Sequence, residues 1–125
     1  MTLSELRGII AALGLSDYTY MGNLDNKKDR SVGVYSRGSV SAYKKAVGGA
    51  DSYNTKEVSL LVHWNKSPSQ SEEAAYNLFN AVQNITSADI LFIKMVNNEP
   101  VFIGTDKVGI YEYVIDFDVY YRLEE

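Results

Sequence analysis

Four titratable side chains have the types and spacing that catalysis or ion binding would need. His63 is the only histidine, and Glu112, Asp116 and Asp118 follow one another at spacings of four and two. In an extended strand, residues an even number of positions apart project from the same side. The three carboxylates would therefore form a row, an arrangement that can bind a hard cation or supply an acid/base pair.

The acidic row also has less specific explanations. Charged residues are mostly exposed, so a row of this kind is more often a solvated sheet face or the charged lining of a channel shared by several subunits. Lys94 and Arg122 can neutralise part of its charge from the same sheet, which weakens the case for a metal.

His63 is similarly limited. A single histidine builds no multi-histidine metal site, and a Ser/His/Asp triad would have to use it. No nucleophile-elbow motif accompanies it, and a lone histidine beside Trp64 on a strand is usually structural. We therefore expect no catalytic residue, no metal or cofactor site, and no enzymatic activity.

The carboxylates lie in residues 108–123, a segment of strict alternation. Aromatic and β-branched residues at alternate positions are the strongest sequence signal for a strand with one buried side. A strand over residues 110–123 would reach about 46 Å, whereas a compact domain of this length is roughly 36 Å across. The strand therefore bends at a bulge, or it extends beyond its domain as an edge that another chain must cover. One face would hold Tyr111, Tyr113, Ile115, Phe117, Val119, Tyr121 and Leu123.

Two helices are predicted from their caps and apolar stripes. Thr2 and Glu5 have the spacing of a capping box, and the stripe that follows predicts a helix over residues 3–13, ended by Gly14. A serine followed by proline begins a second helix, over residues 68–85.

The other periodic segments predict strands. Residues 17–24 and 31–36 are short and separated by a turn-rich segment, so they could form a hairpin. Further strands are expected over residues 57–65, 90–96 and 101–104. The order helix, strands, helix, strands is typical of an α+β domain with a mostly antiparallel sheet and two helices packed on one face.

Composition limits the class of protein. A chain of 125 residues is expected to form a single domain, residues 1–125. The absence of cysteine excludes disulfides, thiol catalysis and zinc–thiolate sites. A formal net charge of -4 argues against a general nucleic-acid binder. No apolar run approaches the ~20 residues of a membrane span and no signal peptide is apparent, so we expect a soluble protein that is not exported.

Residues 37–55 differ in composition from their surroundings. They are rich in Gly, Ser and Ala and carry Arg37, Lys44 and Lys45, with no acidic residue before Asp51. A structureless segment of this length is usually either functional or disordered. We expect a flexible loop, which is either a surface excursion or a contact to a partner.

Residues 103–113 (IGTDKVGIYEY), continued by 116–122 (DFDVYYR), resemble the closing signature of a family of phage proteins labelled minor capsid proteins. Further segments agree in the expected order and extend the resemblance from about residue 18 to residue 122. These are residues 30–35 (RSVGVY), Gly48-Gly49, 58–64 (VSLLVHW), 65–67 (NKS) and the helix with Glu72-Glu73.

The resemblance implies a protein of the head-tail joining region. The predicted order of helices and strands is similar to that of tail terminators of long-tailed phages and related contractile systems. Those proteins form a six-fold ring that caps the tail tube and docks it to the head connector. The implied location is the virion, at the head-tail junction, after assembly in the host cytoplasm. The implied partners are other copies in a hexameric ring, the tail tube protein and a head completion or connector protein; DNA only passes through the channel, and no membrane is contacted.

Two groups of residues have roles under this resemblance. Residues 37–55 and 110–123 would contribute subunit contacts, and the acidic row would face the channel, where negative charge keeps DNA from sticking as it passes. The candidate assembly residues are Arg37, Lys44, Lys45, Tyr111, Tyr113, Tyr120, Tyr121 and Arg122, and the candidate channel-facing residues are Glu112, Asp116 and Asp118.

Three other interpretations stay open. A head completion or stopper protein would have a similar size and many of the same contacts, but it would plug the channel on the capsid side. A general adaptor domain of a cellular protein is argued against only by the resemblance. An enzyme is the most distant alternative, because the sequence offers no cluster of nucleophile, base and oxyanion donors.

Overall fold

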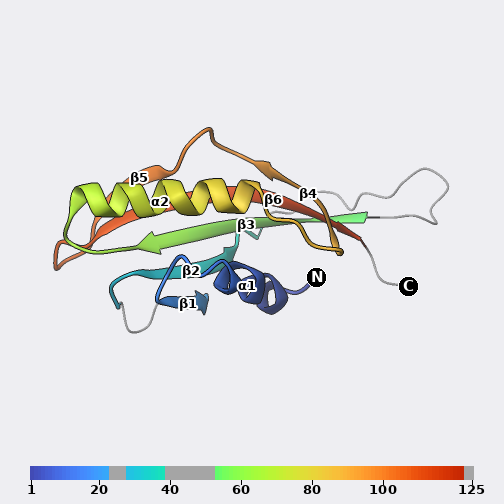
Figure 1. The fold of residues 1–125 in the computed structure, drawn as a ribbon, viewed down its shortest axis with the longest axis horizontal. Helices are drawn as coiled ribbons and strands as arrows, with labels where there is room; N and C mark the ends of the chain where they lie inside the picture. Colours follow the sequence, from blue (N-terminus) through green and yellow to red (C-terminus); the bar gives the residue numbers. More distant parts are fainter. Residues whose placement is uncertain (23–27, 39–52, 123–125) are drawn as a thin grey trace.

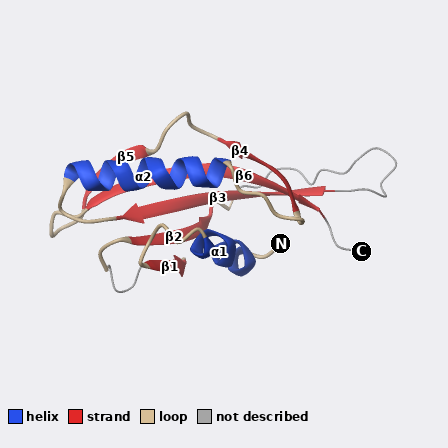
Figure 2. Cartoon of the chain, viewed as in Figure 1, coloured by secondary structure: helices blue, strands red, loops and turns tan. Residues whose placement is uncertain are grey.

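The sheet is the frame of the molecule. The computed structural model describes residues 1–22, 28–38 and 53–122. In this part of the chain, six strands form one sheet, and two helices lie on one of its faces (Figure 1, Figure 2). The strand order is β1-β2-β3-β6-β4, and β5 pairs with β6 beside β4. The elements are α1 (Leu3–Ala12), β1 (Tyr18–Met21), β2 (Ser31–Ser36), β3 (Tyr53–His63), α2 (Pro68–Gln83), β4 (Ile90–Met95), β5 (Val101–Thr105) and β6 (Tyr111–Arg122).

This architecture confirms the predicted α+β class with a mostly antiparallel sheet. The caps also form as predicted. The Thr2 hydroxyl accepts a hydrogen bond from the Glu5 backbone N–H at 3.1 Å, and the Ser67 hydroxyl accepts one from the Gln70 backbone N–H at 3.3 Å. Gly14 has a φ of +69°, the left-handed conformation that ends a helix at little cost for glycine.

The core lies between the helices and one face of the sheet. Alternate residues of the central strands β2, β3 and β6 point to this side, because successive strand residues face opposite ways. They meet the apolar stripes of both helices, and nearly all are shielded from water. The buried set includes Leu6, Ile10, Val32, Val34, Val58, Leu60, Val62, Ala75, Leu78, Val82, Ile115, Phe117 and Val119.

The long alternating strand is the centre of this arrangement. Along one edge, β6 pairs with β3 in unbroken register, from Tyr53 opposite Arg122 to His63 opposite Glu112. Two short strands share the other edge, and the register shifts lie in their pairings with β6. Figure 1 shows that the start of β3 and the end of β6 extend past the C-terminal end of α2. β6 therefore shows no register shift against β3. It is not the exposed edge of the second alternative, because β3 pairs along one side of it and β4 and β5 along the other.

The predicted hairpin between the first two strands is wrong, because β1 and β2 run parallel. Tyr18 lies opposite Ser31, and Met21 lies opposite Val34. The starts of the two strands are fixed side by side by Arg30, whose carbonyl oxygen accepts a hydrogen bond from the Asp17 N–H at 2.8 Å. Short alternating segments with a turn-rich connection do not encode strand direction, so the sequence left the parallel pairing undetermined.

Two other boundaries also differ from expectation. β3 begins at Tyr53 instead of residue 57, because its early residues pair with the end of β6 even though they are too polar to show a clear pattern. The expected flexible loop therefore loses its last residues to a strand. Its centre, residues 39–52 with Lys44, Lys45 and Gly48-Gly49, lies outside the described residues.

Candidate functional site

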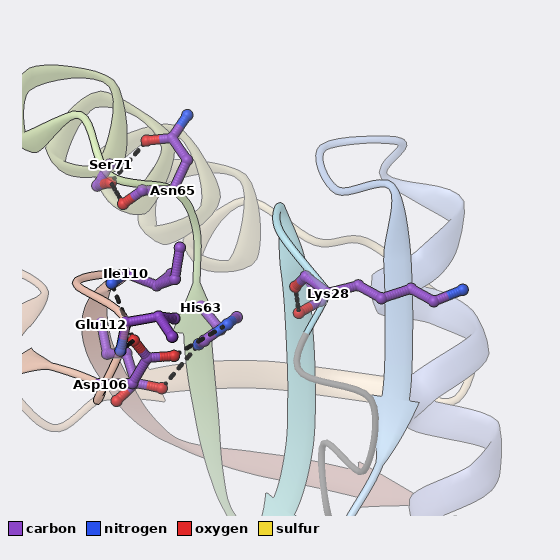
Figure 3. A network of polar contacts seen from close by, with 9 residues as sticks. Lys28, His63, Asn65, Ser71, Asp106, Ile110 and Glu112 are labelled. Atoms are coloured by element: carbon purple, nitrogen blue, oxygen red, sulfur yellow. Dashed lines mark hydrogen bonds and ion pairs between the residues drawn. The ribbon is translucent and has the colours of Figure 1, made fainter.

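A polar junction at one end of the sheet brings the end of β3 together with the β5–β6 turn and the start of β6 (Figure 3). It is organised by His63, the last residue of β3, whose ring is 1% exposed. Its Nδ1 atom lies 2.9 Å from Glu112 Oε2, and its Nε2 atom lies 3.6 Å from Asp106 Oδ2. One buried ring thus contacts a carboxylate on β6 and another in the turn between β5 and β6.

Asp106 also stabilises the β5–β6 turn through hydrogen bonds to its backbone. Its Oδ1 atom accepts hydrogen bonds from the backbone N–H groups of Val108 and Ile110, both at 2.9 Å. Gly109 has a φ of +90°, a conformation that side chains other than glycine rarely adopt. The conformation of the β5–β6 turn therefore explains why residue 106 is an aspartate and residue 109 a glycine.

Asn65 makes a second set of contacts that joins the sheet to α2. Its Oδ1 atom accepts hydrogen bonds from the Ser67 N–H at 3.0 Å and the Ser71 hydroxyl at 3.2 Å, and its amide donates to Gln70 at 2.8 Å. Several segments that carry the phage resemblance, namely residues 58–64, 65–67 and 103–113, meet at this junction. Several residues of these segments therefore make the contacts that join the end of the sheet, the β5–β6 turn and α2.

The acidic row lies on the face of the sheet opposite the helices, as its spacing predicted, and each member has a partner within the chain. Glu112 contacts His63, Asp116 accepts a hydrogen bond from the Ser59 hydroxyl, and Asp118 pairs with Arg37. The row is therefore a set of cross-strand polar pairs, and its charge is partly compensated. Its orientation toward a channel stays a prediction.

Arg37 closes a three-member ion cluster on this face. Its Nη2 atom pairs with Asp118 on β6 and lies 3.4 Å from Glu57 Oε2 on β3. The side chains of Arg37, Glu57 and Asp118 are only 21%, 23% and 18% exposed. Glu57 and Asp118 lie directly opposite each other in the β3–β6 register. Without the guanidinium, two largely buried carboxylates would face each other across the strands, which is destabilising.

We predict that Arg37→Met lowers the free energy of unfolding by about 1–2 kcal/mol, between the values typical of exposed and buried ion pairs. The matched control is Arg122→Met, an exposed arginine at the end of β6, for which a change within about 0.5 kcal/mol is expected. Urea denaturation followed by the fluorescence of Trp64, the single tryptophan, measures both. Equal losses in the two variants would show that the ion cluster does not stabilise the sheet.

The candidate assembly tyrosines fall into two environments. Tyr113 and Tyr121 lie in the core, each with 8% of its surface exposed. Burial is the main cause that raises the pKa of Tyr113, and the negative charge of the nearby Glu72 adds to it. Tyr111 and Tyr120 are half-buried. Tyr120 stacks on Phe92 with ring centroids 4.3 Å apart, on the face opposite the helices. Arg122 is exposed, and subunit contacts by any of these residues stay a prediction.

A surface that the sequence did not identify lies along β4 and β5. These strands form one outer edge of the sheet, and several large apolar side chains of these strands and of the adjoining residue Val96 are exposed. The available signal was the unbroken apolar runs of residues 90–93 and 101–103, because consecutive apolar residues in a strand face both ways and cannot all be buried by one layer of helices. We call this surface the β4–β5 edge; it comprises Leu91, Phe92, Val96, Val101, Phe102 and Ile103.

Tyr76 ties α2 to the turn behind this edge. Its hydroxyl donates a hydrogen bond to Glu99 Oε2 at 3.0 Å. This hydrogen bond, and secondarily burial, raises the pKa of Tyr76, because the ionised ring would have to face a carboxylate. The helix therefore supports the segment between β4 and β5 from the side.

Comparison with known proteins places this architecture in a phage context. Residues 9–122 match the model of a family described as bacteriophage tail terminator protein. No curated protein matches the chain. Among the described residues, neither helix has the length and apolar character to cross a membrane.

Proposed function

Because the chain belongs to the family of bacteriophage tail terminator proteins, and so is a structural component of the phage tail, we propose that it forms a ring that caps the tail tube and joins it to the head connector. The observation that carries this proposal is the family match over residues 9–122, nearly the whole chain.

The function of such a ring is geometric. One face would complement the last ring of tail tube subunits and so stop polymerisation, and the other would accept a head completion protein. Contacts between unlike surfaces of identical subunits close into a ring when the rotation between neighbours divides a full turn. We propose six copies, the number that the tail terminator resemblance implies.

The acidic row is proposed to face the channel of this ring. It lies on the face of the sheet that the helices do not cover, and the chain as a whole carries a net charge of -4. Negative charge along a channel wall repels the phosphate backbone, so DNA would pass without binding. The Ser59 hydroxyl and the Arg37 guanidinium hold Asp116 and Asp118 in place, and Arg37 also offsets part of the negative charge of the row.

The test combines the purified protein with purified tail tube protein. We expect sedimentation to show a closed oligomer, and electron microscopy to show it at one end of tubes whose growth has stopped. Tubes assembled without this protein should keep growing. A protein that stays monomeric and never appears at tube ends would exclude the terminator function, and its presence on DNA-filled heads without tails would instead favour a stopper.

A further inference from the structure

Among the described residues, most of the large apolar side chains that are exposed lie at two opposite edges of the sheet. At one edge is the β4–β5 edge defined above. At the other is β1, where Tyr18 and Met21 are exposed and the Lys28 ammonium lies 4.6 Å from the centroid of the Tyr18 ring; we call this surface the β1 edge. β1 is the first strand in the sheet order, and β4 and β5 lie beyond β6 at the far end. Figure 1 shows the two edges on opposite sides of the molecule.

From this arrangement we infer that neighbouring copies join head to tail, with the β4–β5 edge of one subunit packed on the β1 edge of the next; the inference rests on the proposed ring. A ring of identical subunits needs two unlike surfaces on each copy, placed on opposite sides. A single foreign partner would need only one. Two separate apolar edges on one sheet meet the requirement of a ring.

The composition of both edges fits a protein interface. Interface cores are enriched in aromatic residues and methionine. Phe92 and Phe102 are 55% and 51% exposed on one edge, and Met21 is 53% exposed on the other. The thioether of methionine packs favourably against aromatic rings.

The contact is made by side chains and not by strand addition. Register shifts interrupt the pairing of both β4 and β5 with β6, and the two strands are separated by residues 96–100. Irregularities of this kind prevent an edge from serving as a template for another strand. β1 offers only four residues. A continuous sheet across the subunit boundary is therefore not formed.

The experiment uses one charged substitution on each edge. Ile103→Asp alters the β4–β5 edge, and Met21→Asp alters the β1 edge; both positions are more than half exposed, so each monomer should keep its fold. We expect each variant alone to associate at least tenfold more weakly than the unmodified chain, because a carboxylate placed in an apolar contact must be desolvated. The control is Val108→Asp, at a 66%-exposed position in the β5–β6 turn that belongs to neither edge, which should assemble normally.

Mixing the two variants gives the sharper result. Each retains the surface that the other has lost, so an equimolar mixture should form dimers with one intact contact and no larger rings. Sedimentation velocity, with and without tail tube protein, measures this, and circular dichroism confirms the fold of each variant.

The outcomes separate this inference from the proposed function. If the unmodified chain and both edge variants all form rings, the inferred contact between the edges is wrong, and the proposed ring is still supported. If the variants form rings but no longer bind tail tubes, the edges are docking surfaces for the tube and the inference is again overturned. If the unmodified chain forms no ring under either condition, the proposed function and this inference fail together.

Discussion

Replacing His63 by alanine is expected to lower the free energy of unfolding by about 3 kcal/mol, because it removes a hydrogen bond to Glu112 and leaves a cavity at a buried position. The ring is 1% exposed, and the two carboxylates that face it are also largely buried, with Asp106 and Glu112 12% and 21% exposed. Their removal from water is compensated by the imidazole. The substitution leaves both carboxylates without this partner and adds a cavity.

The destabilisation caused by His63→Ala should be largest in the β5–β6 turn. Asp106 links the ring to the backbone N–H groups of Val108 and Ile110. If the imidazole of His63 positions Asp106, hydrogen exchange at these two amides should accelerate in His63→Ala more than exchange in α1, which packs against β1 and β2. A uniform acceleration across the chain would show global destabilisation without a local tie.

A second substitution separates the polar contacts from simple packing. His63→Gln retains an amide donor that can reach Glu112 and cannot serve both carboxylates at once. We expect a loss of about 1–2 kcal/mol, intermediate between the unmodified chain and His63→Ala. Urea denaturation followed by Trp64 fluorescence measures the series. If glutamine is as damaging as alanine, the hydrogen bond to Glu112 is not what stabilises the junction.

The location of His63 also bears on whether it could act as a catalytic base, as the sequence left open. A general base must reach a substrate proton, and this ring is buried with both nitrogens facing carboxylates of its own chain. The geometry is that of a structural tie between β3, β6 and the turn, in agreement with the expectation that a lone histidine beside Trp64 is structural.

The features that the sequence predicted well are those encoded by local periodicity. The alternation of β6 fixed which side chains enter the core and placed Glu112, Asp116 and Asp118 together on the other face. The caps at Thr2 and Ser67 marked both helix starts. These signals depend on residues within one or two turns or along one strand, so a single sequence contains them fully.

The features that the sequence did not predict depend on distant pairs. Arg37 and Asp118 are 81 positions apart, and nothing in either neighbourhood identifies the other as its partner. The parallel pairing of β1 and β2 likewise joins two segments whose relative direction neither one encodes. The same is true of the junction, where His63, Asp106 and Glu112 meet only after the sheet has formed. Periodicity identifies a strand and its two faces, but it does not determine which strands lie beside that strand in the sheet.

Replacing Phe117 by alanine is expected to cost about 3–5 kcal/mol, as for other large-to-small changes in a packed core. Phe117 is fully buried on the helix side of β6. It lies where the sheet is paired on both sides, opposite Val58 on β3 and Met95 on β4. The structure around it can therefore collapse only slightly, because movement of β6 would disturb both neighbouring strands. A loss below about 2 kcal/mol would show that this part of the core repacks.

The matched control is Phe92→Ala, which removes the same atoms from the β4–β5 edge. Phe92 is 55% exposed and stacks on Tyr120, so its loss should cost only about 1 kcal/mol. The stabilities of both variants should be compared in a chain that also carries Ile103→Asp, because subunit association adds to the stability of an oligomer. In the otherwise unmodified chain, Phe92→Ala should weaken ring formation while its monomer remains folded. Phe117→Ala should lower the unfolding midpoint, and any of it that stays folded should still associate. Opposite effects of the same chemical change at two positions of one sheet would show that its core and its edge serve separate purposes.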